Sequence, residues 1–480
     1  MVPEAGGQRH DRQNGQEEAA AQPSPERQPA ASAPKSPDLS ETEQGDGLSG
    51  KLLIPKPPRG TRDILPEETP LWQHLELITQ STLKNAGYKE IRVPIFEHTE
   101  LFKRSVGETT DIVNKEMYTF ADKSDRSLTL RPEGTAGVVR AYMHGSLHRQ
   151  TQPVKLWYLG PMFRYEGTQT GRQRQFHQVG LEAFGSAGPL IDAEVIVVAL
   201  EYLKRAGLTD FDLQLNSIGC PVCRPAYREL LRSTLAPKLA SLCADCQDRF
   251  QRNPLRMLDC KSKHCQAQYQ DVPASLDHLC NECQAHWGGL ISLLEQERIS
   301  YLVNKRLVRG LDYYTRTVFE VVSRDSRLGA QSTILAGGRY DNLVEMFGGP
   351  PTAAVGWALG LERLCLLLAS PGAERPFAFI VSSSPAKALE IASALRSQGV
   401  SCELDFPQRG TEARSFTKQL QQANKLGAAW AVIAGEDELA SGEVTLKDMK
   451  AGGQNRVPLA SLSGLLIERS GSGRPGKLTG

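Results

Sequence analysis

Residues 307–320 read LVRGLDYYTRTVFE, and this stretch says more about the fold than any other. It brings Arg309, Asp312, Tyr313 and Tyr314 together and then continues as an alternating strand. Successive strand residues point to opposite faces, so a rigid sheet can direct Arg309 and a tyrosine at one small ligand. No acidic neighbour is obviously placed to neutralise Arg309. The pattern predicts a β-sheet with a binding site on one face.

The composition limits the classes of protein that fit. A chain of 480 residues is long enough for two or three domains. Its 56 Lys+Arg and 55 Asp+Glu give a net charge of +1, so a nucleic-acid-binding surface must be local. No apolar run reaches the roughly 18 residues that a membrane helix needs, and the first residues lack an apolar signal core. We therefore expect a cytoplasmic protein with no membrane partner.

The chain divides by composition. Residues 1–50 hold few large apolar side chains and predict a disordered tail, because they cannot bury enough surface to offset their ordering entropy. Residues 51–375 predict the main folded domain. From Pro376 strands and helices alternate, which predicts a small α/β domain over residues 376–470. Residues 471–480 predict a second disordered tail.

Short, closely spaced strand candidates in the main domain favour an α+β fold with a largely antiparallel sheet. Apolar residues from Leu71 to Leu83 at helical spacing predict a preceding helix that stops near Gly87. The strand candidates of this domain are 91–96, 127–130, 155–159, 175–184 and 211–217. In the C-terminal domain the candidates are strands 377–381, 401–406 and 429–434 and helices 386–396 and 412–426.

The segment TLRPEGT, residues 129–135, follows a strand and opens a helix. Pro132 and Gly134 bend the backbone, so that the Glu133 carboxylate and the Thr135 hydroxyl can contact a small ammonium-bearing ligand. Thr and Glu are also favoured at any helix N-terminus. The residues alone therefore support a ligand site and a helix cap equally.

A predicted hairpin over residues 160–182 carries three arginines, which suit a polyphosphate because the guanidinium donates paired hydrogen bonds to phosphate oxygens. Period-two alternation places Gln178 and Glu182 on one face. Gly180 between them would leave room for a ligand near the backbone. The three arginines are Arg164, Arg172 and Arg174.

Two glycine-rich blocks, LAGGRYD at 335–341 and AVGWALGLERL at 354–364, permit close approach of the backbone. The second predicts a strand that runs into a helix and places Arg363 in the first turns. The helix N-terminus and the arginine both favour a phosphate or a stacked nucleotide. Neither block matches the dinucleotide-binding fingerprint or the Walker A loop.

Eight of the ten cysteines lie between residues 220 and 283. Cys220-x2-Cys223 and Cys243-x2-Cys246 are separated by 19 residues, which fits a two-knuckle zinc site, and Cys260, Cys265, Cys280 and Cys283 follow. In a cytosolic protein such pairs indicate metal more than disulfides. A structural zinc and ordinary reduced cysteines packed in helices both fit the spacing, so metal ligation stays undecided.

Together these blocks resemble the three signature motifs of class II aminoacyl-tRNA synthetases. Residues 92–97 are similar to the first motif, 163–166 to the second and 360–363 to the third. Within the class, 307–314 and 336–341 resemble the two peptides of histidyl-tRNA synthetases. The resemblance extends from about Pro58 to about Leu466 and omits only the tails.

The resemblance implies a catalytic domain over 51–375 with an inserted Cys-rich helical subdomain at about 220–300, and an anticodon-binding domain over 376–470. It implies ATP-dependent ligation of histidine to its tRNA through histidyl-adenylate, with Mg²⁺, by a homodimer. The insertion resembles a clamp on the tRNA acceptor stem. The implied residues are Glu133, Gly134, Thr135, Gln178, Glu182, Arg309, Tyr313 and Tyr314 for histidine, Arg164, Arg172, Arg174 and Arg363 for ATP, and Arg309 and Arg164 for catalysis.

The same residues argue against two alternative functions. A regulatory paralogue that binds histidine without catalysis would lack the C-terminal domain and lose the ATP-binding arginines, and this chain keeps both. A class II synthetase for threonine or proline is opposed by Glu182 and the pair Tyr313 and Tyr314. An exchange assay between ATP and pyrophosphate across the twenty amino acids separates these functions.

Overall fold

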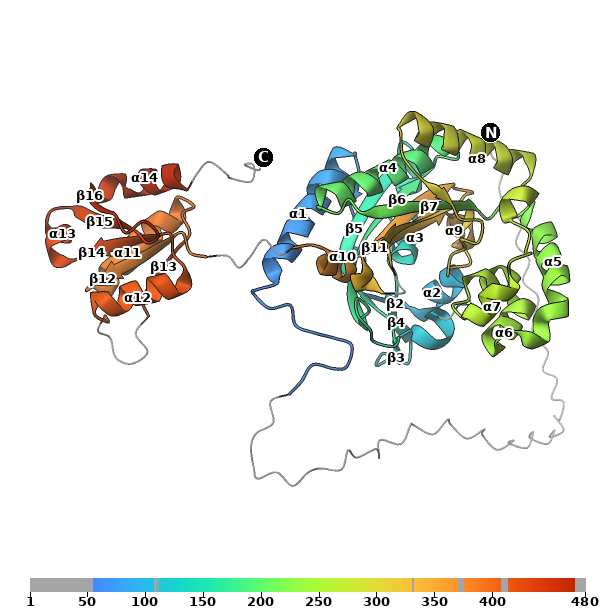
Figure 1. Ribbon diagram of the computed structural model, residues 1–480, viewed down its shortest axis with the longest axis horizontal. Helices are drawn as coiled ribbons and strands as arrows, with labels where there is room; N and C mark the ends of the chain where they lie inside the picture. Colours follow the sequence, from blue (N-terminus) through green and yellow to red (C-terminus); the bar gives the residue numbers. More distant parts are fainter. Residues whose placement is uncertain are drawn as a thin grey trace, which may run out of the picture. The chain divides into compact units, whose positions relative to one another are not determined.

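The computed structural model describes residues 55–107, 110, 112–329, 332–369, 375–406 and 413–470. The tails predicted at 1–50 and 471–480 lie outside these residues. An eight-stranded sheet of order β1-β5-β6-β11-β10-β9-β7-β8 is its largest feature (Figure 1). The strands are β1 (Lys89–Glu90), β5 (Val154–Phe163), β6 (Gln175–Phe184), β7 (Phe211–Ser217), β8 (Leu302–Val303), β9 (Thr315–Ser323), β10 (Thr333–Arg339) and β11 (Ala354–Gly360).

This sheet is antiparallel from β5 to β7 and parallel only at its two edge pairs, β1 with β5 and β7 with β8. The predicted antiparallel sheet is therefore confirmed. The predicted strands 175–184 and 211–217 coincide with β6 and β7, and 155–159 lies within the longer β5. Regular alternation of apolar and polar residues made these strands readable from the sequence.

The two faces of the large sheet pack against different sets of helices. Val179, Leu181 and Ala183 of β6 pack into a core with α1 (Thr69–Asn85), α4 (Pro189–Arg205), α8 (Asn281–Gln296) and α10 (Leu361–Leu367). The opposite face packs against α3 (Thr135–His144) and α9 (Leu343–Met346). Because strand residues alternate, Gln178 and Glu182 lie on this second face. It is the face that carries the cavity described below.

The chain between β1 and β5 forms a three-stranded sheet of order β2-β4-β3. It consists of β2 (Phe96–His98), β3 (Thr119–Ala121) and β4 (Ser127–Leu130), with α2 (Thr99–Val106) after β2. The prediction of one strand over 91–96 is wrong, because the chain between β1 and β2 forms no strand. Pro94 has no N–H group to donate to a neighbouring strand. The Val93 carbonyl accepts a hydrogen bond from the Arg131 side chain at 2.9 Å, and the Ile95 carbonyl accepts one from the Arg131 backbone N–H at 2.8 Å.

The described residues between β7 and α8 form short helices, in agreement with the predicted helical insertion. They include α5 (Arg224–Leu235), α6 (Ala244–Arg252) and α7 (Lys263–Gln268). The clusters of buried residues here are small, and one of them combines Cys246, Cys260 and Cys265 with Leu235, Leu242, Met257 and Tyr269. Cysteine thus makes up much of the core of this insertion.

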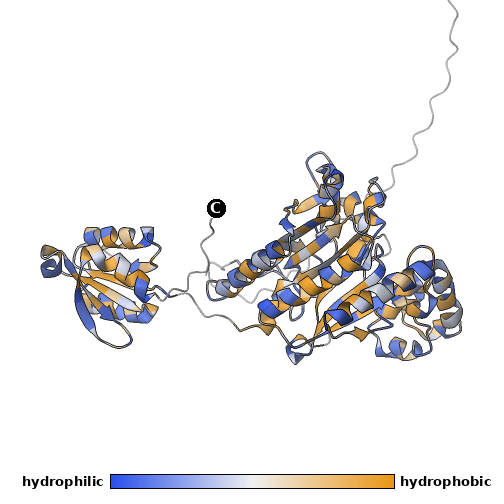
Figure 2. Cartoon of the chain, turned by 90° about the horizontal axis from the view of Figure 1, so that it is seen from above, coloured by the Kyte–Doolittle hydropathy of each residue, from blue (hydrophilic) through white to orange (hydrophobic). Residues whose placement is uncertain are grey.

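The C-terminal part contains a five-stranded mixed sheet of order β13-β12-β14-β15-β16. Figure 2 shows hydrophobic residues gathered in its inner strands. β13, β12 and β14 are parallel, as the alternation of strands and helices predicts, whereas the hairpin of β15 and β16 is antiparallel and was not predicted. The elements are β12 (Ala378–Ser382), α11 (Pro385–Ser397), β13 (Cys402–Leu404), α12 (Phe416–Leu426), β14 (Trp430–Ala434), α13 (Glu436–Ala440), β15 (Glu443–Asp448), β16 (Gln454–Pro458) and α14 (Leu462–Arg469).

Candidate active site

A cavity of about 400 Å³ opens on the α3 face of the large sheet. Such a volume suits a small-molecule ligand. Polar and charged side chains from the loop after β5, from β6, from the segment before β9 and from α10 meet in it. The predicted residues that line it are Glu133, Thr135, Arg164, Arg172, Gln178, Glu182, Arg309, Tyr313, Tyr314 and Arg363. Gly134 and Arg174 are outside this lining.

Glu182 lies at the floor of the cavity and is almost fully buried. Its carboxylate accepts hydrogen bonds from the Thr135 hydroxyl at 2.7 Å and from the Tyr340 hydroxyl. Burial raises the pKa of Glu182 to about 8, although both hydroxyls act in the opposite direction. Tyr340 was not assigned a role from the sequence, but it stands in the 335–341 block and its ring is buried against Tyr313.

Glu133 serves both interpretations that the sequence left open. Its carboxylate accepts the backbone N–H groups of Thr135 and Ala136 at 2.7 and 2.8 Å, so it caps α3. It also lines the cavity. Burial raises the pKa of Glu133, while those backbone hydrogen bonds lower it. The carboxylate is thus held in a fixed position at the edge of a ligand-sized space.

Gln178 presents an unsatisfied acceptor to this region. Its side-chain Oε1 is buried and has no hydrogen-bond donor among the described residues. The expectation that Gly180 leaves room for a ligand is wrong, because a Cβ there would lie 2.0 Å from the Tyr158 ring. Gly134 faces the same ring, with its Cβ position 2.2 Å away. These two glycines therefore leave room for the Tyr158 ring.

Arg309 departs from its prediction in two respects. It lies in the irregular segment before β9 and not on a strand, since β9 begins at Thr315. It also has an acidic partner, because its guanidinium is paired with the Glu320 carboxylate. Burial lowers the pKa of Arg309, but Glu320 and Tyr314 act against it and the net shift is upward. The arginine remains charged within the cavity.

Three further arginines extend the positive side of the cavity. Arg164 donates to the Pro132 carbonyl at 2.8 Å, and Arg172 is paired with Glu166 at 2.7 Å. Burial, together with Arg172 and Arg164, lowers the pKa of Arg363. Neighbouring cations repel one another, so a ligand with several negative charges would relieve this strain. Arg174 instead stacks on the Tyr165 ring at 3.8 Å.

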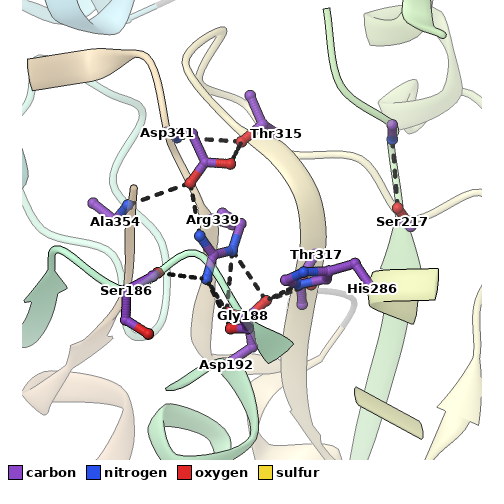
Figure 3. Close-up of polar contacts among 11 residues, drawn as sticks. Ser186, Gly188, Asp192, Ser217, His286, Thr315, Thr317, Arg339, Asp341 and Ala354 are labelled. Carbon is purple, nitrogen blue, oxygen red and sulfur yellow. Dashed lines mark hydrogen bonds and ion pairs between the residues drawn. The ribbon is translucent and has the colours of Figure 1, made fainter. Parts of the chain in front are cut away.

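A buried charge network, which no sequence motif indicated, joins α4 and α8 to the large sheet (Figure 3). Asp192 of α4 accepts hydrogen bonds from Arg339 at 2.6 Å, Thr317 at 2.7 Å and His286 at 2.8 Å. Arg339 also contacts Asp341 at 2.8 Å. Burial raises the pKa of Asp192, but His286 and Arg339 outweigh it and hold the pKa below its ordinary value.

The eight clustered cysteines form two groups of four. The first cluster is Cys220, Cys223, Cys280 and Cys283, and the second cluster is Cys243, Cys246, Cys260 and Cys265. Pairing of Cys220-x2-Cys223 with Cys243-x2-Cys246 in one site, which the spacing suggests, is therefore wrong. The chain returns to the first cluster only after the whole insertion, so sequence separation misleads. All eight lie outside the lining of the cavity.

The sequence and the structure are similar to those of known proteins. A family model described as histidyl-tRNA synthetase matches residues 60–364, and one described as an anticodon binding domain matches residues 378–469. The histidine–tRNA ligase of Desulforamulus reducens is 50% identical over 84% of this chain and 97% of its own. That of Pelotomaculum thermopropionicum is 50% identical over 86% of this chain and 97% of its own. The crystal structure of apo histidyl-tRNA synthetase from S. aureus is 36% identical, covers 86% of this chain and 100% of its own, and has a TM-score of 0.72.

The antiparallel sheet and its cavity of arginines and acids thus define a class II aminoacyl-tRNA synthetase. The chain belongs to the histidyl-tRNA synthetase family. It catalyses the ATP-dependent formation of histidyl-tRNA, and the mixed α/β C-terminal part is its anticodon-binding domain. Among the residues that the structure describes, no helix is both long and apolar enough to cross a membrane.

Proposed function

We propose that both half-reactions take place in the cavity between Glu182 and the arginines. The histidine carboxylate attacks the ATP α-phosphate, pyrophosphate leaves, and histidyl-adenylate remains bound. The terminal adenosine hydroxyl of the tRNA then takes the acyl group and AMP leaves. The observation that carries this assignment is the presence of a buried acid and several cations in one lining. Pyrophosphate exchange stimulated by histidine alone among the twenty amino acids is the test.

Glu182 would recognise the histidine side chain. An imidazole has two distinguishable nitrogens. The Glu182 carboxyl is held in one orientation by its hydrogen bonds with Thr135 and Tyr340, so it can form a directed hydrogen bond with one of these nitrogens. Tyr313 and Tyr314 would enclose the ring. Burial raises the pKa of both tyrosines, so their hydroxyls stay neutral and act as hydrogen-bonding groups rather than charges.

The α-amino group of histidine would bind to Glu133, Thr135 and Gln178. The unsatisfied Oε1 of Gln178 supports this assignment, because a buried acceptor with no donor costs free energy that a ligand N–H would recover. The Glu133 carboxylate, fixed by two backbone N–H groups, would add the negative charge that an ammonium group prefers. Gly134 would act only through the packing of Tyr158.

Arg164 and Arg309 would bracket the α-phosphate while Arg363 and Arg172 contact the rest of ATP. Preorganised cations stabilise the charge that develops on phosphate oxygens as the bond to pyrophosphate breaks. The buried Nε of Arg309 has no acceptor among the described residues, so it can donate to a phosphate oxygen without giving up Glu320. Arg174, which stacks on Tyr165, would hold the hairpin in place instead.

Mg²⁺ fits the same end of the cavity. Carboxylate oxygens are its usual protein ligands, and Glu166 and Glu320 both line the cavity beside arginines. We assign these two acids to an ion that arrives with the ATP phosphates. When bound, the ion supplies charge neutralisation on the nucleotide. Arg172 and Arg309 would then share these carboxylates with the ion while they contact the phosphates.

We further propose a cytoplasmic homodimer that binds histidine tRNA through its insertion and its C-terminal domain. Support for the dimer comes from exposed apolar side chains on the small sheet. Ile95 is 44% exposed, Phe96 53% and Phe120 44%, and the two phenylalanine rings touch at 6.5 Å between centroids. A second copy would cover this surface at little cost in polar desolvation.

A further inference from the structure

The geometry points to two tetrahedral zinc sites per chain, one in each four-cysteine cluster, that hold the insertion together and attach it to the large sheet. In both clusters the four sulfur atoms lie within 4.8 Å of one another. A tetrahedral Zn²⁺ with bonds of about 2.3 Å separates its sulfur ligands by about 3.8 Å. The structure reproduces that spacing.

In the first cluster the Sγ atom of Cys220 lies 3.9 Å from that of Cys223 and 3.8 Å from that of Cys280. Cys223 and Cys283 are 3.9 Å apart. In the second cluster Cys243 and Cys260 are 3.8 Å apart. A disulfide needs about 2.05 Å, so none of these pairs is bonded. Four thiols that converge within this range form a complete tetrahedral ligand set, whereas cysteines that merely share a core need not converge.

The backbone around the clusters favours thiolates. Cys220 Sγ accepts the Val222 N–H at 3.4 Å, and Cys223 Sγ accepts the Cys220 N–H at 3.2 Å. Donors directed at sulfur are expected where the sulfur carries charge. In the second cluster the Tyr269 hydroxyl donates to Cys246 at 3.0 Å, inside the fold. These partners would satisfy the remaining lone pairs of metal-bound thiolates.

Helix ends add to this effect. Cys223 is the N-cap of α5, Cys243 the N-cap of α6 and Cys280 the N-cap of α8. The positive end of a helix lowers the free energy of a thiolate, and four thiolates without a counter-ion would repel one another strongly. A divalent cation resolves that repulsion. Arg224, next to Cys223, adds further positive charge near the first cluster.

The positions of the clusters explain what the metals would do. Cys220 and Cys223 follow β7, whereas Cys280 and Cys283 begin α8, so the first site would tie the two ends of the insertion together. The second site would replace a hydrophobic core that the short helices α6 and α7 cannot provide. Since no cysteine lines the cavity, both ions would be structural and outside the reaction.

The first site would also hold part of the active site. Arg224 donates to the Tyr314 carbonyl at 2.6 Å and to the Gly219 carbonyl at 3.1 Å. The backbone of the predicted histidine-binding segment therefore rests on the residue that follows Cys223. The second cluster also borders the cavity, because Asp259 and Lys261, on either side of Cys260, belong to its lining.

Metal analysis of the full-length protein, purified under reducing conditions without chelator, tests the inference independently of activity. We expect two zinc ions per chain. The pair variants Cys280→Ser/Cys283→Ser and Cys243→Ser/Cys246→Ser should each retain one. The matched control Cys365→Ser/Cys402→Ser removes the cysteines outside the clusters and should retain two. Iron in place of zinc, a content below two in the unaltered protein, or a content unchanged in both pair variants would overturn the assignment.

Misfolding of a variant is separated by a measurement on the unaltered chain. An organomercurial reagent titrated into the native protein should release two equivalents of zinc to a chromogenic chelator as the cluster thiols react. Cobalt exchanged into the same protein should give the visible bands of tetrahedral thiolate coordination. Release of no metal, or cobalt bands without a sulfur-to-metal transition, would reject the sites even if every variant failed to fold.

Discussion

Arg309 and Glu320 form an ion pair inside the cavity, and both side chains are largely shielded from water. If Arg309 acts in catalysis as we propose, it must either share its charge with the ligand or exchange partners when ATP binds. Its buried Nε, which has no acceptor in the described part of the chain, makes sharing feasible. The pair also complicates mutagenesis, because loss of Arg309 leaves a buried carboxylate uncompensated.

Arg309→Ala should lower the rate of adenylate formation by about 10²–10³-fold, since one preorganised donor to the reacting phosphate is lost. The double variant Arg309→Ala/Glu320→Gln removes the uncompensated carboxylate and should recover stability but not activity. Pyrophosphate exchange and urea unfolding measure the two properties. Recovery of exchange in the double variant would show that Arg309 acts through folding alone.

Glu182→Gln should raise the Michaelis constant for histidine by about 10–100-fold and leave that for ATP nearly unchanged. An amide keeps the shape but presents an NH₂ group in place of one carboxyl oxygen and cannot take up or release a proton, so the imidazole meets a weaker partner in a buried site. Steady-state exchange kinetics with each substrate varied in turn provides the measurement. Equal losses for both substrates would assign Glu182 to the structure of the cavity instead of histidine recognition.

The same residue should make ligand-free stability depend on pH. Its folded pKa of about 8 lies above the ordinary 4.5, so the folded state holds the proton more tightly. The stabilising contribution is complete below about 4.5 and is lost as the pH rises through about 8. The unfolding free energy of the unaltered protein should therefore fall more steeply over this window than that of Glu182→Gln. Parallel curves from urea titrations would contradict the assignment.

Asp192→Ala should destabilise the fold by about 3–5 kcal/mol, because it leaves Arg339 buried without its main partner. Asp210→Ala is the matched control. Asp210 pairs with Arg324 on the surface, where both side chains are more than half exposed, and its loss should cost at most about 1 kcal/mol. Urea unfolding of the two variants decides whether the buried network carries this free energy.

Phe96→Asp should shift the protein from dimer to monomer, since it places a charge on the exposed apolar surface of the small sheet. Leu190→Asp changes another exposed apolar residue, on α4, and should leave the assembly intact. Sedimentation at micromolar concentration distinguishes a dimer from a chain of 52.6 kDa. A monomer already in the unaltered protein would rule out the proposed assembly.

Elements marked by a local sequence pattern were predicted correctly, whereas contacts between distant residues were not. β6 and β7 were located correctly because apolar and polar residues alternate along them. The hairpin of β15 and β16 was missed because β16 is nearly all exposed and polar, so no period of two marks it. Arg309 was placed on a strand because the alternation of β9 was extended backwards through a segment that is irregular.

The partners of charged residues could not be read from the sequence for a physical reason. Asp192 and Arg339 are 147 positions apart, and no local pattern links them. The sequence shows that each residue carries a charge, but it does not show which residue is the partner. The cysteine clusters failed in the same way, since the chain closes the first one only after 60 residues.

Gly356 of β11 lies opposite Glu182 in the sheet, and a Cβ there would come within 1.9 Å of Glu182 Oε2. The carboxylate therefore occupies space that a neighbouring strand leaves by having no side chain. A Cβ at 356 would also lie 2.3 Å from the backbone carbonyl oxygen of Leu181, so a larger residue would displace both the Glu182 carboxylate and the strand that carries it. The missing side chain on β11 therefore decides how deep in the sheet the acid can sit, and position 356 sets the depth of the compartment through Glu182 itself.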